Sequence, residues 1–102
     1  MVSVVSDKLD AITALCRKYG VVRLYLFGSA VGSDFEPGRS DVDLLVDFGS
    51  MDGYAKAHVY FDLLDELREA LGTEVDLVMI GAVKNRYIAA EIERTKQMLC
   101  AA

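Results

Sequence analysis

Apolar side chains near the start of the chain recur every three or four residues, which is the spacing of one face of a helix. The members of this stripe are Val5, Leu9, Ile12, Cys16 and Tyr19. Gly20 follows the stripe and is typical of the position after a helix, while Ser6 has the side chain of an N-cap. The pattern predicts a first helix over residues 6–19.

Three later segments have the pattern of β-strands, over residues 22–28, 40–48 and 74–80. The first is rich in β-branched and aromatic residues, and the other two alternate between apolar and polar positions. In the second segment one side carries Val42, Leu44, Val46 and Phe48, and the other carries Asp41, Asp43, Leu45 and Asp47. In the third, Glu74 and Asp76 alternate with apolar residues.

Two further helices are expected, one between the last two strands and one after them. Residues 54–71 carry an apolar stripe that ends just before Gly72, and residues 83–100 carry a second stripe. The inward members of this second stripe are Ile88, Ile92 and Leu99. Residues 30–40 are polar and contain glycine and proline, so a turn or short helix followed by a loop is expected there.

The order of these elements favours the α/β class. Strands that alternate with helices predict a small mixed three-stranded sheet with helices packed on one face. The chain has 102 residues, so we expect a single domain over residues 1–102. The opposite face of the sheet would then carry Asp41, Asp43 and Asp76, which makes it the first candidate for a site.

Composition and charge exclude several classes of protein. Hydrophobic residues make up 53% and charged residues 26% of the chain, as in folded globular proteins. The net charge of −5 repels a phosphate backbone, so free nucleic acid is not an expected substrate. A spanning helix needs about 18 consecutive apolar residues, and neither such a run nor a signal-peptide pattern is found. We therefore expect a cytoplasmic protein that does not bind membranes.

Four residues that often carry chemistry are expected to be structural. Cys16 and Cys100 lack the paired spacing of a zinc site or a redox motif, so both are predicted to be reduced, partly buried thiols. His58 is expected on the surface of the long helix. Tyr87 opens the last helix, where contact with a base or a partner is an alternative, but packing is the favoured role.

The acids of Asp41-Val42-Asp43 point to the same side of a strand, with Cα atoms about 6.6 Å apart. Carboxylates this close repel each other unless a cation lies between them, and Mg²⁺ accepts one or two carboxylates beside water and phosphate oxygens. Asp76 on a neighbouring strand would allow a second ion, as in two-metal sites. The alternative is that the acids merely blunt an exposed strand edge, the usual explanation for an isolated motif of this kind.

A Gly-Ser pair lies at the end of the first strand, where a helical turn is expected to begin. Gly28 lets a phosphate approach the backbone closely, and Ser29 adds a hydroxyl to the N–H groups of a helix start. By itself the pair is a common turn. Because it ends one strand while the aspartates open the next, it is predicted to place phosphate donors beside metal ligands.

The segment LFGSAVGSDFEPGRSDVDLLVDF resembles the signature of the polymerase-β-like nucleotidyltransferase superfamily, and more narrowly that of the minimal nucleotidyltransferases (MNT). The shared features are the Gly-Ser pair, a loop, the Asp-x-Asp motif and a third acid on a later strand, here Asp76. The closing stretch KNRYIAAEIERTKQMLCAA resembles the last helix of the family, so the likeness covers nearly the whole chain. The combination is much more specific than any one motif.

The resemblance implies a nucleotidyltransferase fold and a role for each site residue. Asp41 and Asp43 would hold two Mg²⁺ ions and the triphosphate of ATP, which is the substrate. Asp76 would share one metal and orient or deprotonate the attacking hydroxyl. Gly28 and Ser29 would bind the β- and γ-phosphates.

Two departures from the family pattern affect the phosphate side of the site. Eleven residues, 30–40, separate the Gly-Ser pair from the acids, one more than is usual, and Val31 stands near where many members have an arginine. A longer surface loop costs little free energy. Arg39 is placed to supply the missing charge, and we include Arg39 and Ser40 among the expected nucleotide contacts.

The resemblance also implies a partner. MNT proteins are typically antitoxins paired with HEPN-type RNase toxins, and members of the family attach AMP to a tyrosine of the toxin. Two alternatives stay open: an antitoxin that acts by contact alone, and a transferase for a small molecule such as an aminoglycoside. The intact acids favour catalysis, and the lack of an acceptor-binding domain disfavours the small molecule. Exposed apolar residues on the last helix would also permit a homo-oligomer.

Overall fold

The computed structural model describes residues 1–32 and 34–101. Its elements are α1 (Ser3–Ser6), α2 (Leu9–Lys18), β1 (Arg23–Phe27), the short 3-10 helix η1 (Gly28–Val31), β2 (Val42–Asp47), α3 (Gly53–Leu71), β3 (Val75–Met79), α4 (Arg86–Thr95) and β4 (Gln97–Ala101). No helix in this part of the chain has the length and apolar character needed to cross a membrane.

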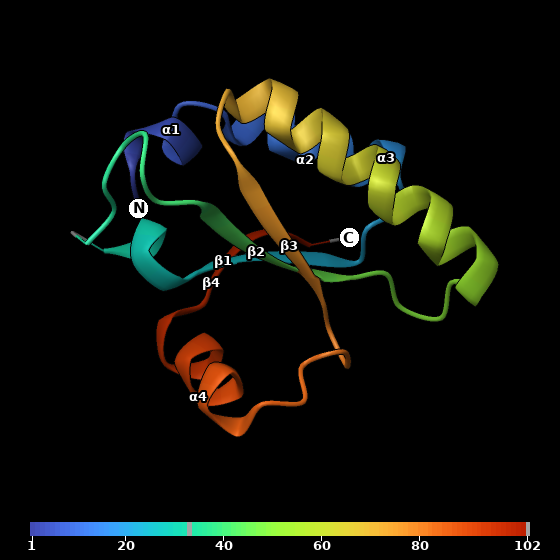
Figure 1. The fold of residues 1–102 in the computed structure, drawn as a ribbon. Coiled ribbons are helices and arrows are strands. Elements are labelled where there is room, and N and C mark those ends of the chain that lie inside the picture. Colours follow the sequence, from blue (N-terminus) through green and yellow to red (C-terminus); the bar gives the residue numbers. More distant parts are fainter. Residues whose placement is uncertain (33, 102) are drawn as a thin grey trace.

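The strands form one mixed, four-stranded sheet in the order β3-β2-β1-β4 (Figure 1). β1 runs antiparallel to both of its neighbours, β2 and β4, whereas β2 and β3 are parallel. β3 and β4 are therefore the two edges of the sheet. The predicted mixed α/β class is confirmed, but the prediction of three strands is one too few.

The additional strand is β4, which lies inside the segment 83–100 that periodicity assigns to one helix. α4 ends at Thr95, and the chain then extends so that Cys100 pairs with Leu24 of β1 and Met98 pairs with Tyr25. The apolar run at residues 98–100 suits either a helix face or a strand, and pairing with the open side of β1 decides for the strand. This pairing is a long-range contact, which local periodicity does not report.

The N-terminal helix also differs from the prediction. The chain forms α1 and α2 in place of a single helix over residues 6–19. Ser6 is the last residue of α1, and α2 begins after Lys8 without a side-chain cap, so the prediction of Ser6 as N-cap is wrong. The end of α3 is as predicted, because Gly72 takes the left-handed conformation (φ 67°) and its N–H bonds to Arg68 O.

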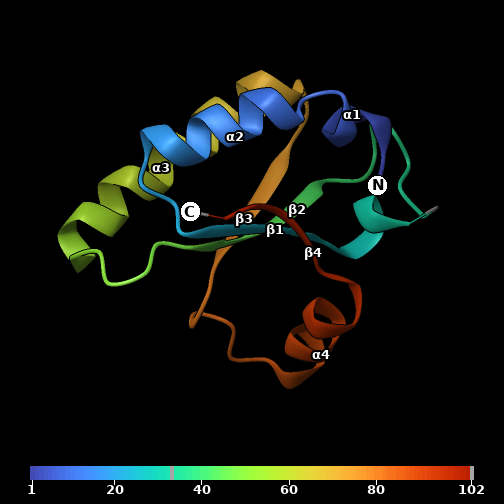
Figure 2. The same ribbon diagram turned by 180° about the vertical axis from the view of Figure 1, so that it is seen from behind.

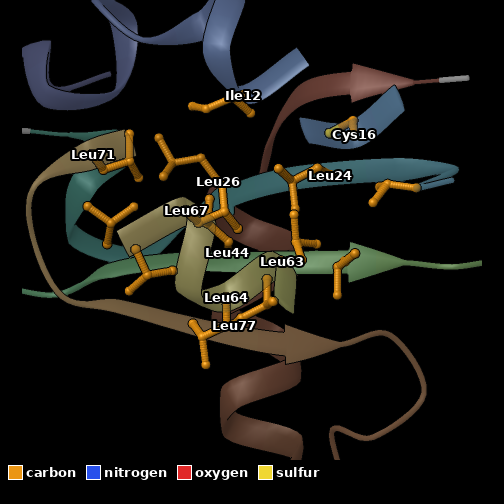
Figure 3. Close-up of a cluster of buried hydrophobic side chains, with 14 of the residues drawn as sticks. Ile12, Cys16, Leu24, Leu26, Leu44, Leu63, Leu64, Leu67, Leu71 and Leu77 are labelled. Atoms are coloured by element: carbon orange, nitrogen blue, oxygen red, sulfur yellow. The ribbon is translucent and has the colours of Figure 1, made fainter. Parts of the chain in front are cut away.

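Helices lie on both faces of the sheet. α1, α2 and α3 cover one face, and α4 lies against the other (Figures 1 and 2). The side chains buried completely in the core of the first face include Ile12, Leu24, Leu26, Leu44, Leu63 and Leu67 (Figure 3). On the second face Phe27 and Leu45 form a smaller apolar cluster with Ile92 of α4. The expectation of helices on one face only is therefore wrong.

A disulfide joins α2 to β4 through Cys16 and Cys100. Neither cysteine is free among the residues that the structure describes, so the prediction of two reduced thiols is wrong. The two residues are 84 positions apart, and no local spacing connects them. They meet because β4 is a strand beside β1, under α2, and this strand was itself missing from the predicted fold.

Reduction of this disulfide should lower the stability of the protein. A bond that closes a loop of 84 residues restricts the unfolded chain. We therefore expect dithiothreitol, or Cys16→Ser, to reduce the free energy of unfolding by about 2–4 kcal/mol. Urea denaturation with and without dithiothreitol measures the difference, and Cys16→Ser should no longer respond to the reductant. Identical transitions for the wild type, with two thiols that react before any reduction, would contradict the pairing.

Candidate active site

The candidate site lies where three strands bring acids and a glycine together. Within the sheet Asp43 of β2 is paired with Phe27 of β1 on one side and with Asp76 of β3 on the other. Gly28 follows Phe27 directly, and Asp41 immediately precedes β2. Asp43 is therefore the centre around which the other predicted groups are arranged.

This arrangement destabilises the ionised form of Asp43. Its carboxyl is partly buried, and its pKa is raised from 3.8 to about 6, first by burial and then by the charges of Asp76 and Asp41. The carboxylates of Asp76 and Asp41 therefore both lie within electrostatic range of Asp43. A cation placed among them would relieve both the burial cost and the repulsion.

The glycine turn lies directly against this carboxylate. Gly28 has a left-handed backbone (φ +73°), which a residue with a side chain adopts only with strain. A Cβ atom here would lie 2.6 Å from Asp43 Oδ2, closer than two such atoms approach in proteins. Both constraints favour glycine, and they show that the backbone of Gly28 lies in close contact with the Asp43 carboxylate.

A cavity of about 670 Å³ lies between this part of the sheet and α4. Its sheet side consists of Phe27, Gly28, Ser29, Asp43, Asp76 and Val78, and its helix side of Ala82, Val83, Lys84, Asn85, Tyr87, Ile88 and Glu91. The volume is in the range of nucleotide and cofactor sites. The structure thus brings Gly28, Ser29, Asp43 and Asp76 to one cavity, as the sequence pattern predicts, with Asp41 beside it.

Two predicted nucleotide contacts lie elsewhere. The Arg39 guanidinium is exposed and pairs with Glu36 at 3.5 Å. Ser40 Oγ accepts the N–H of Glu36 at 3.0 Å, and the N–H of Ser40 donates to Glu36 O at 2.8 Å. Both residues close the turn that leads to Asp41, and neither lines the cavity. Their contact with a nucleotide stays a prediction.

Thr95 is a member of the site that local patterns do not select. Its hydroxyl oxygen accepts the N–H of Gly28 at 3.0 Å, so the last turn of α4 touches the glycine turn. In a helix predicted over residues 83–100, nothing sets Thr95 apart from other interior positions. Had β4 been predicted, the helix would have ended at Thr95, and the residue would have been noticed as a helix end next to the site.

Tyr87 faces solvent at the cavity instead of packing into the core. Its exposed fraction is 79%, so the favoured packing role is wrong. Asn85 caps α4 here, because its side-chain oxygen accepts the N–H groups of Tyr87 and Ile88 at 2.8 and 3.3 Å. The cap fixes the first turn of α4 at the rim of the cavity.

The three acids suit a hard cation that brings ligands of its own. Within residues 1–32 and 34–101, no three His, Cys, Asp or Glu side chains form a complete metal-binding group. Mg²⁺ does not need one, because it commonly takes one or two carboxylates and fills its shell with water and phosphate oxygens. Asp41 and Asp43, with Asp76 nearby, fit this partial donor set.

The fold and the cavity together define an enzyme class. Acids on a mixed sheet, beside a glycine turn and a cavity large enough for a nucleotide, are the features expected of a nucleotidyltransferase. The chain belongs to the nucleotidyltransferase domain family, whose model matches residues 10–99. The resemblance found in the sequence motifs is thereby confirmed.

Two proteins of Methanocaldococcus jannaschii are similar to this chain. One, provisionally named protein adenylyltransferase MJ0128, is 42% identical over 79 residues, which are 78% of this chain and 76% of that protein. The other, provisionally named protein adenylyltransferase MJ1379, is 36% identical over 77 residues, which are 74% of each.

Solved structures share the fold. One provisionally described as a minimal nucleotidyltransferase is 26% identical, with a TM-score of 0.65 and coverage of 91% of this chain and 90% of that chain. A chain of a toxin–antitoxin crystal structure with AMP-PNP has a TM-score of 0.69 at 24% identity, covering 92% and 73%. A chain from the complex of a tri-AMPylated Shewanella oneidensis HEPN toxin with its MNT antitoxin has a TM-score of 0.63 at 23% identity, covering 95% and 72%. The predicted nucleotidyltransferase fold is confirmed.

Asp43→Asn should stabilise the protein in the absence of ligands. Because the folded state raises the pKa of Asp43 from 3.8 to about 6, the free energy of unfolding should fall as the pH rises between these values. The amide removes this loss, and we expect a gain of about 1 kcal/mol at pH 7.5, allowing for solvent screening of a partly exposed group. Urea denaturation at pH 4.5 and 7.5 measures it, with the exposed acid Asp62 changed to Asn as control. A less stable Asp43→Asn variant at pH 7.5 would show that burial and the neighbouring charges do not destabilise the ionised carboxylate in the folded protein.

Gly28→Ala should weaken ATP binding, whereas Gly72→Ala should not. Both glycines have a left-handed backbone, with φ of +73° and +67°, so both substitutions cost conformational energy. Only at Gly28 would the new methyl group meet Asp43, because nothing lies within 4 Å of a Cβ at Gly72. We expect at least a roughly tenfold weaker Kd for Gly28→Ala in calorimetric titration, from displacement of the turn. Equal ATP affinities for the two variants would show that the Gly28 turn does not take part in nucleotide binding.

Proposed function

We propose that this nucleotidyltransferase uses Mg²⁺ to transfer AMP from ATP to a tyrosine hydroxyl of a HEPN-type toxin, and so acts as its antitoxin. The observation that carries the proposal is the position of Asp43, which lies against the Gly28 turn in one cavity with Asp76, while Asp41 lies beside that cavity within electrostatic range. The names of the relatives, protein adenylyltransferases, support a protein acceptor. The AMPylated HEPN toxin bound to an MNT antitoxin, in a structure of the same fold, supports the kind of partner.

Each site residue has a proposed task. Asp41 and Asp43 would hold Mg²⁺, which when bound would offset the triphosphate charge and polarise the α-phosphate. Asp76, on the strand beside Asp43, would accept the proton of the acceptor hydroxyl and align its oxygen for attack. Ser29 would offer its hydroxyl and backbone N–H to the β- and γ-phosphates.

The glycine of the phosphate turn has a different task from its serine. The N–H of Gly28 already donates to Thr95 Oγ1, so this amide is engaged within the protein. Gly28 would contribute space and curvature, because its lack of a Cβ lets the triphosphate and Asp43 approach the same stretch of backbone. The reaction itself then needs positioning and charge stabilisation more than covalent chemistry from the protein.

The acceptor would approach over the first turn of α4. Tyr87 and Ile88 line the cavity and are 79% and 49% exposed, so they offer an apolar surface beside Asp76. A HEPN-type protein that docks on this surface would bring its tyrosine to the acids. We also assign the enzyme to the cytoplasm, because a transferase of this type depends on a supply of ATP.

A contact antitoxin without catalysis is the second candidate, and the same exposed surface on α4 is what favours it. The two functions differ in their dependence on the acids. Binding through α4 would neutralise a toxin whether or not Asp41, Asp43 and Asp76 were intact. Covalent transfer requires all three.

Mass spectrometry of the partner should separate these functions. The protein is mixed with Mg²⁺, ATP and the HEPN-type protein proposed as its partner, and we expect the partner to gain the mass of AMP. Asp76→Asn should retain ATP binding better than Asp41→Asn but lose transfer by at least about 100-fold, because the acceptor hydroxyl is no longer aligned and deprotonated. Asp62→Asn, an exposed acid on α3, is the matched control and should transfer AMP normally.

The competing result is equally clear. An unmodified partner, together with full neutralisation of its activity by the Asp41 and Asp76 variants, would reject catalysis and leave a contact antitoxin.

A further inference from the structure

A single hydroxyl joins the last turn of α4 to the glycine turn. Thr95 Oγ1 accepts the N–H of Gly28 at 3.0 Å and donates to Glu91 O at 2.8 Å. An amide N–H only donates and a carbonyl only accepts, so the direction of both hydrogen bonds is fixed. The bond to Glu91 holds the hydroxyl on its own helix, with a lone pair directed at Gly28.

This contact extends the pairing of β1 with β4 beyond the end of the sheet. The ladder runs from Arg23 and Ala101 to Leu26 and Gln97, and the same antiparallel register continued by two residues would place Gly28 opposite Thr95. At that point the chain is still helical on the α4 side. A side-chain oxygen therefore takes the place of the backbone carbonyl that a longer strand would have offered.

The position held by this bond is critical for the acids. Gly28 lies so close to Asp43 that an added Cβ would be 2.6 Å from its Oδ2, and Ser29 follows on the same turn. Any outward movement of Gly28 would change both the space beside Asp43 and the direction of the Ser29 donors. Misplacements of about 1 Å are enough to cost an active site much of its rate.

We propose that Thr95 is a positioning residue, whose hydroxyl sets the Gly28–Ser29 turn at the distance from Asp43 at which the metal-bound triphosphate is held. α4 does not depend on this bond for its place in the fold, because Ile92 anchors it in the apolar cluster with Phe27 and Leu45. The proposal rests on nucleotide binding in this cavity. It is independent of the acceptor.

Two substitutions at Thr95 and one control test the proposal. Thr95→Val keeps the shape of the side chain and removes the hydroxyl, whereas Thr95→Ser keeps the hydroxyl. Thr13→Val makes the same change on α2, on the other face of the sheet. Two quantities are measured: the hydrogen exchange rate of the Gly28 amide by NMR without ligand, and the Kd for AMP-PNP with Mg²⁺ by calorimetry.

We expect the Gly28 amide to be protected from exchange in the wild type. In Thr95→Val its exchange should accelerate roughly five- to tenfold, the loss expected for one hydrogen bond, and the Kd for Mg²⁺-AMP-PNP should weaken by about tenfold. Thr95→Ser and Thr13→Val should stay within about twofold of the wild type in both quantities. A helix that merely needed Thr95 for folding would lose stability without this joint change.

Several results would overturn the inference. Rapid exchange of the Gly28 amide in the wild type would show that its hydrogen bond to Thr95 is not formed in solution, whatever the variants do. Faster exchange in Thr95→Val with unchanged nucleotide affinity would show that the turn needs no such positioning. If Thr95→Val does not fold, Thr95→Ala replaces it. Wild-type nucleotide affinity in Thr95→Ala would likewise show that the turn needs no such positioning. Because no acceptor is used, failure here leaves the proposed transfer to the toxin untouched, and failure of that transfer leaves this result valid.

Discussion

The geometry of the site depends on the position of Asp43 between two strands that run in opposite directions. Antiparallel pairing with β1 places the glycine turn on one side of its carboxylate, and parallel pairing with β3 places Asp76 on the other. A slip of one residue would turn Asp43 toward the main core under α1, α2 and α3, because side chains alternate between the two faces of a strand. Completely buried residues such as Leu44 prevent that slip, so the apolar core on one face determines where the acids stand on the other.

The same crowding opposes ionisation of Asp43 in the protein without ligands, and under the proposed function it would favour the binding of a cation. Partial burial and neighbouring charges oppose the ionised form of Asp43, and Mg²⁺ with a triphosphate would turn this repulsion into binding free energy. The protein separates the two demands in space. Leu24 and Leu26 of β1, with Leu67 of α3, supply stability on one face, whereas the charged groups face α4, which covers only a small apolar cluster.

Sequence patterns predicted those parts of the molecule that local order determines. Alternation along β2 located the acids, and glycine at the end of β1 located the turn, because each depends on neighbours within a few residues. β4, the disulfide and the Thr95 contact were missed, since they join residues that are far apart, 84 positions for the cysteines and 67 for Gly28 and Thr95. The segment at residues 97–101 fits a helix as well as a strand until β1 is present to pair with it.

The segment that carries α4 leaves the sheet at one edge, after β3, and rejoins it at the other, as β4. It is fixed to the sheet at both ends, and it spans β1 and β2 beside Gly28 and Asp43. A segment fixed at both ends does not swing open like a lid. A wider opening would require an edge strand to detach. The disulfide between Cys16 and Cys100 attaches β4 to α2. The edge strand without such a covalent bond is β3, the strand that carries Asp76.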